Sequence, residues 1–255
     1  MDRLVLDALN VSKSYSDLRV LDSFNLALRS GQIHGLLGPN GSGKSTCLHI
    51  LTGLIPADSG EVLLQEVPIT SKESRQYLGF APDDLPLPEM LTGREYIEFH
   101  RSLRKRGSGE VADGLVEVFG MSEALNKQIC KYSHGMKRKI QLIVALAHEP
   151  MLLVLDEPFR GLDPDAAVVL RTLIREFADS GRAVLMATHD MFGAERDCDE
   201  VTVLSSGKTM ANGSPSSLTA GASVASLEEV FLAVTGLDQS TTTRRKAVSQ
   251  LFAPA

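Results

Sequence analysis

The first third of the chain alternates short apolar stretches with polar turns. Three stretches have the composition of β-strands: residues 4–9, 24–28 and 33–37. The pair Ser30-Gly31 is a turn signal between the last two of them. A glycine-rich loop follows the third strand directly, and residues 45–54 then predict a helix closed by Gly53.

The middle of the chain has helical spacing instead. Between about residue 84 and residue 149, apolar positions predict three helices, at residues 95–103, 111–119 and 136–147. After Pro150 the pattern returns to strand, helix and strand, over residues 152–155, 164–178 and 183–187. This alternation predicts an α/β fold with a mostly parallel sheet, into which the helical block is inserted. Residues 211–226, rich in Gly, Ser and Ala, predict a loop or linker, and the polar segment after Gly236 is expected to fray.

Composition narrows the class of protein. The apolar runs fall short of a membrane span, and the first residues lack the layout of a signal peptide, so a cytoplasmic location is expected. Cys47, Cys130 and Cys198 lie far apart and form no CxxC pair, which favours core or incidental thiols. The formal net charge of −6 argues against a general nucleic-acid binder.

The glycine-rich loop fits the pattern G-x-x-x-x-G-K-[ST] between a strand and a helix, the setting that gives this pattern meaning. Its glycines let successive backbone N–H groups point at one phosphate, and the following helix adds its positive N-terminal end. Lys44 supplies a mobile charge for the β- and γ-phosphates, and Ser45 offers a hydroxyl to Mg²⁺. The predicted phosphate-binding residues are Gly38, Pro39, Asn40, Gly41, Ser42, Gly43, Lys44, Ser45 and Thr46.

The second element with candidate chemistry is an acidic pair that follows the buried strand at residues 152–155. Asp156 and Glu157 stand where that strand emerges, and ligands of α/β sheets bind at this edge. Asp156 is predicted to hold Mg²⁺ opposite Ser45, and Glu157 to polarise the attacking water as general base.

Three further candidate sites each have an ordinary structural explanation as the alternative. Ser133 and Gly135 start a helix and form a second anion site, although a plain N-cap by Ser133 explains the same residues. His189 follows a strand and is predicted to contact the γ-phosphate, against a purely structural role. Tyr15 is predicted to stack on adenine, against a simple surface tyrosine.

Taken together, these pieces resemble the ATP-binding cassette (ABC) family from residue 15 to about residue 236. The resemblance rests on the segments GPNGSGKST, LLVLDE, YSHGM, GLDP and ATHD, which look like the family's Walker A, Walker B, signature, D-loop and switch histidine. It implies a P-loop NTPase fold with an N-terminal antiparallel β subdomain and an ATPase domain over residues 1–236. The helical subdomain would span about residues 84–149, and residues 237–255 would form a polar tail.

The resemblance also implies ATP and Mg²⁺ as cofactors and a head-to-tail dimer, either homodimer or heterodimer. ATP on Lys44 of one subunit would be closed over by Ser133 and Gly135 of the other, with Asp163 linking the two sites. Glu157 and His189 would be the catalytic residues.

Two positions depart from the family pattern. His134 replaces the first glycine of the usual LSGGQ signature, while Ser133 and Gly135 remain. Asp83 replaces the glutamine expected after Phe80-Ala81-Pro82. Asp83 is still predicted to reach Mg²⁺, with Ser45 and Asp156, but it adds negative charge beside the γ-phosphate.

The segments YSHGMKRK and SLEEVFLAVTG resemble bacterial ABC-2-type exporter ATPases, whose membrane permease subunits are separate chains. This implies a peripheral location on the inner face of the cell membrane, with residues 83–106 docking on the permease.

Three alternatives are less well supported by the sequence. A soluble ABC ATPase acting on ribosomes or DNA would need a tandem cassette or long insertions that this chain lacks. A GTPase would need an aspartate after Asn126-Lys127, and a non-catalytic binding module would not need Glu157 and His189.

Overall fold

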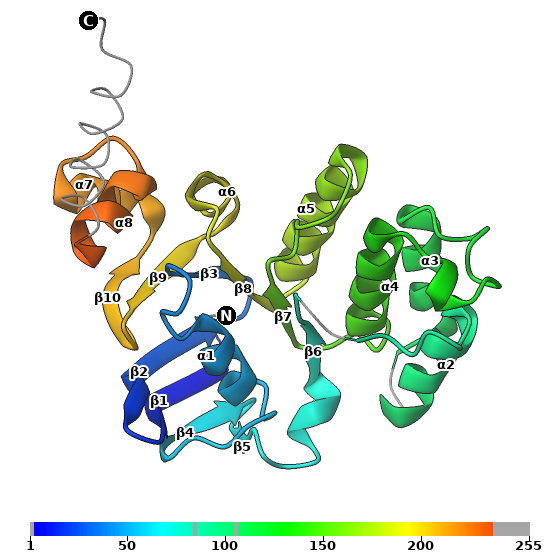
Figure 1. Cartoon of the computed structure of the whole chain (residues 1–255), viewed down its shortest axis with the longest axis horizontal. Coiled ribbons are helices and arrows are strands. Elements are labelled where there is room, and N and C mark those ends of the chain that lie inside the picture. The colour runs from blue at the N-terminus through cyan, green and yellow to red at the C-terminus, as the bar shows by residue number, and fades with distance from the viewer. Residues whose placement is uncertain (1–2, 84–85, 105–106, 237–255) are drawn as a thin grey trace, which may run out of the picture.

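The computed structural model describes residues 3–83, 86–104 and 107–236 (Figure 1). The predicted tail at 237–255, and positions 84, 85, 105 and 106 of the predicted docking block, lie outside the described residues. The strands are β1 (Leu4–Tyr15), β2 (Leu18–Arg29), β3 (Ile33–Leu37), β4 (Ser59–Leu64), β5 (Val67–Pro68), β6 (Leu78–Ala81), β7 (Leu152–Asp156), β8 (Ala183–Thr188), β9 (Glu200–Ser205) and β10 (Lys208–Gly213). The helices are α1 (Lys44–Leu51), α2 (Gly93–Arg104), α3 (Gly109–Val118), α4 (His134–Leu146), α5 (Pro164–Asp179), α6 (Met191–Asp197), α7 (Pro215–Ala222) and α8 (Leu227–Thr235), with short 3-10 helices η1 (Ser74–Tyr77) and η2 (Ile129–Lys131).

The described strands form two sheets. One is antiparallel, in the order β2-β1-β4-β5, and the other has the order β10-β9-β3-β8-β7-β6. In the second sheet every neighbouring pair is parallel except β10 with β9. The mostly parallel core sheet and the N-terminal antiparallel sheet are both confirmed.

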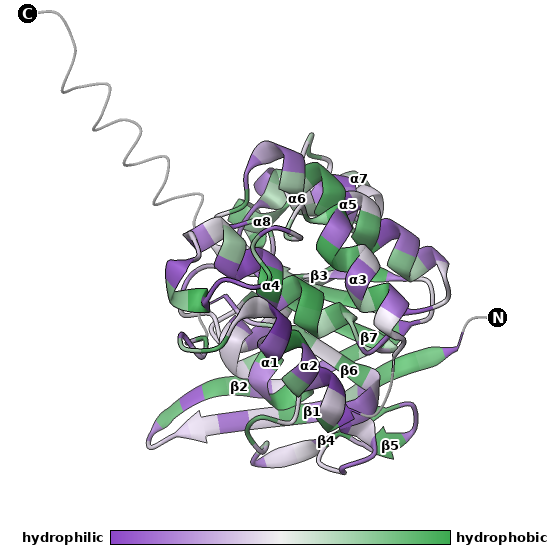
Figure 2. Cartoon of the chain, turned by 90° about the vertical axis from the view of Figure 1, so that its right-hand side faces the viewer, coloured by the Kyte–Doolittle hydropathy of each residue, from purple (hydrophilic) through white to green (hydrophobic). Residues whose placement is uncertain are grey.

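The central strands are mostly apolar because both of their faces are covered. On β7, Leu153 and Leu155 join the core shared with α4 and α5, whereas Leu152 and Val154 join the core shared with α1 and the antiparallel sheet. Successive side chains of a strand point to opposite faces, so a continuous apolar run is what such a strand requires. In Figure 2, β7 is coloured hydrophobic, while α3 and α5 carry bands of both colours.

The helical block is inserted between two strands that are neighbours in the sheet. The chain leaves β6, forms α2, α3 and α4, and returns as β7, which pairs in parallel with β6 (Figure 1). The three predicted helices are present, each with ends within about two residues of the expectation. α4 starts two residues earlier than predicted because Ser133 is its N-cap, its hydroxyl accepting from the N–H of Met136 at 3.2 Å.

The prediction of a loop over residues 211–226 was wrong. Part of this segment completes β10, which pairs with β9, and another part forms α7. Ser214 is the N-cap of this helix, its hydroxyl accepting from the N–H of Ser217, and Pro215 is the first helical residue. Small residues therefore marked a helix start and a strand end here.

Within the described residues, no single helix has the length and apolarity needed to cross a membrane. Together, α7 and α8 pass that test by length and composition, but the pair is bent by 63°.

Candidate nucleotide-binding and hydrolysis site

The glycine-rich loop joins β3 to α1, as its sequence predicts. Gly41 and Gly43 have φ angles of 80° and 104°, which glycine adopts without steric cost. A Cβ on Gly43 would lie 2.7 Å from the carbonyl oxygen of Val20, and one on Gly38 would lie 2.4 Å from that of Leu204. The glycines are therefore required both by the turn and by neighbouring backbone.

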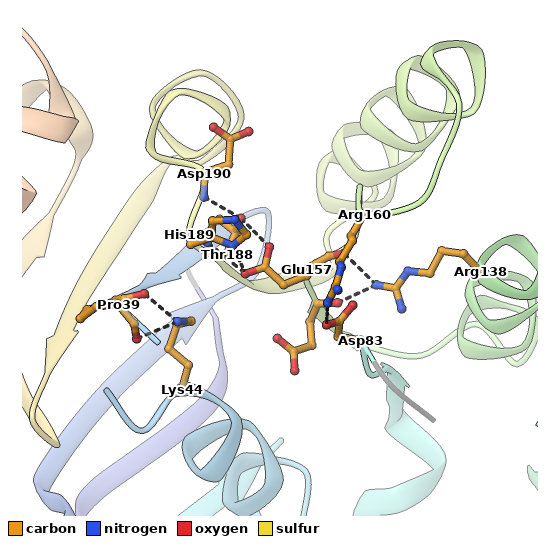
Figure 3. Close-up of polar contacts among 11 residues, drawn as sticks. Pro39, Lys44, Asp83, Arg138, Glu157, Arg160, Thr188, His189 and Asp190 are labelled. Carbon is orange, nitrogen blue, oxygen red and sulfur yellow. Dashed lines mark hydrogen bonds and ion pairs between the residues drawn. The ribbon is translucent and has the colours of Figure 1, made fainter. Parts of the chain in front are cut away.

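Lys44 is held inside this loop. Its side chain is buried, and Nζ donates to the carbonyl oxygens of Gly38 at 2.6 Å and Pro39 at 3.2 Å (Figure 3). Burial lowers the pKa of the Lys44 ammonium, while the carboxylates of Glu157 and Asp156 oppose that shift. Among the described residues, no acidic side chain forms a hydrogen bond with this ammonium, which lies at the base of the loop.

The loop has the chemistry of an anion cradle. The hydroxyl of Ser42 is buried and has no hydrogen-bond partner among the described residues. α1 starts at Lys44 with no side-chain cap at Gly43 and no acidic residue in its first turn. Free N–H groups at a helix N-terminus, an unpaired hydroxyl and a lysine together fit a phosphate group.

Most of the predicted P-loop residues, with the predicted metal ligands and Glu157, line one cavity of about 280 Å³, which we call the phosphate cavity. Gly38, Pro39, Ser42 and His189 are not among its lining residues. It is lined by Val20, Asn40, Gly41, Gly43, Lys44, Ser45, Thr46, Asp83, Asp156 and Glu157. Sequence reasoning missed Val20, because nothing in the sequence shows that the start of β2 lies beside the loop.

Glu157 follows β7 and is fixed by hydrogen bonds from the end of β8. Its Oε1 lies 2.6 Å from Nδ1 and 3.1 Å from the backbone nitrogen of His189, and its Oε2 lies 3.1 Å from the hydroxyl of Thr188 (Figure 3). An ionised carboxylate only accepts hydrogen bonds, so Nδ1 of His189 carries the hydrogen in this arrangement. The described residues fill three acceptor positions of Glu157 and leave one on Oε2.

The Thr188 hydroxyl is oriented by a second contact, since it accepts from the N–H of Asp190 at 3.0 Å. Its own hydrogen is therefore directed at Glu157. Glu157 itself has a φ of 45°, an uncommon angle for a residue with a side chain. The surrounding hydrogen bonds hold that backbone conformation in place.

Asp156 and Asp83 complete an acidic group at the cavity. Burial raises the pKa of the Asp156 carboxyl, and the nearby carboxylates of Glu157 and Asp83 add to the effect. Asp83 pairs with Arg160, whose Nη1 lies 2.5 Å from Oδ2 of Asp83. Sequence reasoning did not foresee this partner, which lies 77 residues away.

Arg138, on α4, ties the helical block to the site. It is buried, and its guanidinium donates to the carbonyl oxygens of Pro82, Asp156 and Glu157 at 2.5, 2.6 and 3.2 Å (Figure 3). Burial lowers the pKa of this guanidinium, with Asp83, Asp156 and Glu157 opposing the shift. One side chain thus holds the ends of β6 and β7 together.

Other predicted site residues lie outside the phosphate cavity of their own chain. Ser133 is an exposed N-cap, and Gly135 packs against Gly161, where an added Cβ would lie 3.1 Å from a carbonyl oxygen. Asp163 caps α5 through the N–H of Ala166 and pairs with Lys139 at 3.3 Å.

Tyr15 lies at the end of β1 and is half exposed, with Nζ of Lys13 5.7 Å from the ring centroid. His189 is also exposed and reaches the site through Glu157. The structure therefore brings together the P-loop, Asp83, Asp156 and Glu157, with His189 beside them, but not Tyr15, Ser133, Gly135 or Asp163.

A parallel sheet with a P-loop at the end of β3 and acids at the end of β7 defines a P-loop nucleotide-hydrolysing protein. Residues 21–160 match the ABC transporter family. The chain is 35% identical over 223 residues to Nod factor export ATP-binding protein I of Rhizobium sp., a match that covers 86% of this chain and 73% of that protein. It is 32% identical over 219 residues to linearmycin resistance ATP-binding protein LnrL of Bacillus subtilis, covering 84% and 70%.

Solved structures agree with the sequence comparisons. The ATP-binding subunit of an ABC transporter superposes with a TM-score of 0.86 at 28% identity, covering 91% of this chain and 99% of that one. A bacterial ABC transporter cassette solved as a dimer gives a TM-score of 0.75 at 25% identity, covering 82% and 98%. The chain belongs to the ABC transporter family and is an ATP-binding, ATP-hydrolysing subunit of that family.

Proposed function

We propose that this chain drives export through separate membrane permease subunits by binding and hydrolysing MgATP at the phosphate cavity. The observation that carries the proposal is the convergence of Lys44, Asp156 and Glu157 on one cavity beside an anion-binding loop. Relatives named for export and for resistance support a transporter, rather than a soluble ATPase acting on ribosomes or DNA.

The phosphates would be held by the backbone N–H groups of residues 38–46, by the Ser42 hydroxyl and by Lys44. On binding, Nζ of Lys44 would exchange its two carbonyl partners for phosphate oxygens. Those carbonyls keep the ammonium pointed into the loop before the ligand binds. This lowers the conformational entropy that the Lys44 side chain loses on binding.

The residues present also fit Mg²⁺. Among the described residues no group of three or more His, Cys, Asp or Glu side chains is arranged to hold a metal alone. Mg²⁺ in nucleotide sites is held by one or two side chains together with phosphates and waters, which Ser45, Asp156 and Asp83 can supply. Bound Mg²⁺ would neutralise charge on the β- and γ-phosphate oxygens.

Glu157 is the proposed general base. The one acceptor position left on its Oε2 suits a water molecule, and the hydrogen bonds from Thr188 and His189 fix the carboxylate that receives the proton. Because Nδ1 of His189 is engaged by Glu157, Nε2 is the atom left to contact the γ-phosphate.

A second subunit would complete the site. Ser133 and Gly135 do not line the cavity of their own chain, although a helix N-terminus is a ready anion site. We propose a homodimer or heterodimer in which these residues contact the ATP of the partner, with Asp163 at the interface. A related cassette was solved as a dimer, which supports the pairing of two subunits. Tyr15 and Val20 would contact the adenosine part of the ATP.

The permease would dock beside α2, on the inner face of the membrane. A cavity of about 860 Å³ lies between α2, η1 and the end of α1. Apolar side chains, including the exposed Leu54 and Leu103, line it together with charged ones such as Lys72 and Arg75. This placement supports docking by the described part of residues 83–106. Crosslinks from Glu89 or Arg94 that never reach a co-expressed permease would contradict it.

Binding of MgATP to the purified chain, followed by calorimetry together with phosphate release, tests the proposed site. Lys44→Ala should abolish binding or hydrolysis, whereas Lys208→Ala, which removes an exposed lysine paired with Asp22, should leave both unchanged. Unchanged affinity and rate in Lys44→Ala would remove the P-loop from the site.

A further inference from the structure

The phosphate cavity carries more negative charge than the family pattern implies. Asp83, Asp156 and Glu157 all line it, and each of them faces the place proposed for the terminal phosphates of ATP. At the first position the family has a neutral glutamine. An acidic residue there would repel both its acidic neighbours and the nucleotide unless another charge compensates it.

Two of the nearby cations are already engaged elsewhere. Lys44 donates to the carbonyls of Gly38 and Pro39, and it is reserved for phosphate. Arg138 donates its hydrogen bonds to backbone carbonyls at the ends of β6 and β7, and not to the Asp83 carboxylate. Neither forms a hydrogen-bonded ion pair with Asp83.

Arg160 is the cation that forms an ion pair with Asp83. Its Nη1 lies 2.5 Å from Oδ2 of Asp83, and in Figure 3 its side chain reaches down toward Asp83 from the turn after Glu157. The backbone places it there, because the N–H of Arg160 donates to the carbonyl oxygen of Glu157 at 3.1 Å. The Arg160 side chain is 66% exposed, whereas that of Asp83 is 26% exposed. Asp83 is thus the less exposed, cavity-lining member of the pair, and Arg160 is the more exposed member outside the lining.

Building on the proposed ATP site, we propose that Arg160 is a positioning residue that cancels the charge of Asp83 and holds its carboxylate at the rim of the phosphate cavity. The pair acts as one neutral unit in place of the family's glutamine. Arg160 thereby allows an acidic residue to stand beside the terminal phosphate without weakening ATP binding.

Four variants of the full-length chain test this proposal: Arg160→Gln, Arg160→Lys, Asp83→Asn and the double variant. Calorimetric affinities for ATP and ADP, each with Mg²⁺ and with EDTA, give a readout that needs no turnover. Arg160→Gln exposes the Asp83 charge, so ATP affinity should fall about tenfold at low ionic strength, and less in high salt. The loss should be larger for ATP than for ADP, and largest with EDTA, where no cation offsets the carboxylates.

The double variant is the decisive one. Removing both charges should return ATP affinity to within about twofold of wild type, and Arg160→Lys, which keeps the charge, should bind nearly as wild type. Arg196→Gln is the matched control, since Arg196 pairs with Asp197 at 2.6 Å with a similarly exposed side chain but does not line the phosphate cavity.

The outcomes separate clearly. An Arg160→Gln variant that binds ATP as wild type does, or a double variant as weak as Arg160→Gln, overturns the proposal. Thermal unfolding of each variant identifies any loss of ATP affinity that is caused by misfolding. The Arg160→Lys variant then shows whether the positive charge at this position is what ATP binding requires. Absence of MgATP binding by the wild-type chain would instead reject the ATP site itself, and this proposal with it.

Discussion

The phosphate-binding half and the hydrolysis half of the site are built in different ways. The contacts of Lys44 reach only five and six residues back along the chain, to Pro39 and Gly38. Glu157 depends on Thr188 and His189, 31 and 32 residues away. Arg138 adds bonds spanning 18, 19 and 56 residues.

This difference separates binding from turnover. In the phosphate-binding loop, the lysine is held by carbonyl groups of the loop itself. A general base that is fixed by two other elements is sensitive to how β7, β8 and α4 are packed. We therefore expect changes in the hydrolysis half to alter the rate while leaving nucleotide affinity nearly unchanged.

The largest effect is expected for Glu157→Gln. The amide cannot accept the proton of the attacking water, so ATP hydrolysis should fall by about 10²- to 10⁴-fold while ATP binding is retained. Phosphate release and calorimetry on the same sample measure the two quantities.

Glu149→Gln is the matched control for that change. Glu149 also has a positive φ, of 52°, but pairs with Arg182 away from the cavity, so its rate should stay at the wild-type value. Turnover within about threefold of wild type in Glu157→Gln would show that another group takes the proton.

Arg138→Met should have the next largest effect. It leaves the partly buried carbonyl groups at the ends of β6 and β7 without the arginine donor, so the free energy of unfolding should fall by about 2–4 kcal/mol. The rate of hydrolysis should fall as well, because the backbone of Glu157 loses a fixed partner. Urea denaturation and steady-state kinetics give the two values.

Arg171→Met is the comparison for Arg138. Its partner Asp197 keeps a second arginine, Arg196, so the loss of stability should be smaller. An Arg138→Met variant no less stable than Arg171→Met would mean that the helical block is not fastened to the site through Arg138.

A fall in pH should destabilise the protein through His34 in β3, the strand that leads into the P-loop. His34, in β3, is buried against the hydroxyl of Thr202 at 2.8 Å, and burial lowers its pKa to about 4. In the unfolded chain this histidine takes up a proton near pH 6.5, whereas in the folded chain it stays neutral down to about pH 4. Its contribution to the free energy of unfolding is therefore fully present above pH 6.5 and is lost as the pH falls toward 4. Between pH 7 and pH 5 this histidine alone should cost about 2 kcal/mol.

Unfolding titrations at the two pH values measure that loss. His34→Gln should reduce the difference by about 2 kcal/mol, whereas His49→Gln, at a partly exposed position of α1, should leave it intact. An equal pH dependence in His34→Gln and wild type would contradict the assignment.

Thr188→Val should have the smallest effect. It removes one of the three hydrogen bonds to Glu157 in a side chain of the same shape, so the rate should fall about fivefold to tenfold with ATP affinity unchanged. Thr202→Val removes a buried hydroxyl on β9, outside the cavity, and should change stability without changing the rate. If the ATP affinity of Thr188→Val falls together with its rate of hydrolysis, the phosphate-binding half and the hydrolysis half do not act separately.

Much of this molecule was determined by local sequence. A β-compatible stretch predicted β3, and continuous apolar runs predicted the buried strands β7 and β8. Helical spacing predicted α2 to α4, and the strand–helix–strand alternation predicted α5, each nearly to its ends. The segment at residues 211–226 was misassigned because small polar residues serve equally as linker and as the cap of a helix. Its helical state depends on β10 and α8, which pack beside it.

The sequence by itself determined the P-loop, because glycine spacing, a lysine and a following helix are sufficient to form an anion cradle. It also placed Asp156 and Glu157 at the edge of the sheet. Only the tertiary structure decided that Arg160 meets Asp83, that Arg138 joins α4 to β6 and β7, and that Thr188 orients Glu157. Those contacts depend on which strands become neighbours in the sheet, and strand order is set by the packing of the whole core rather than by any one segment.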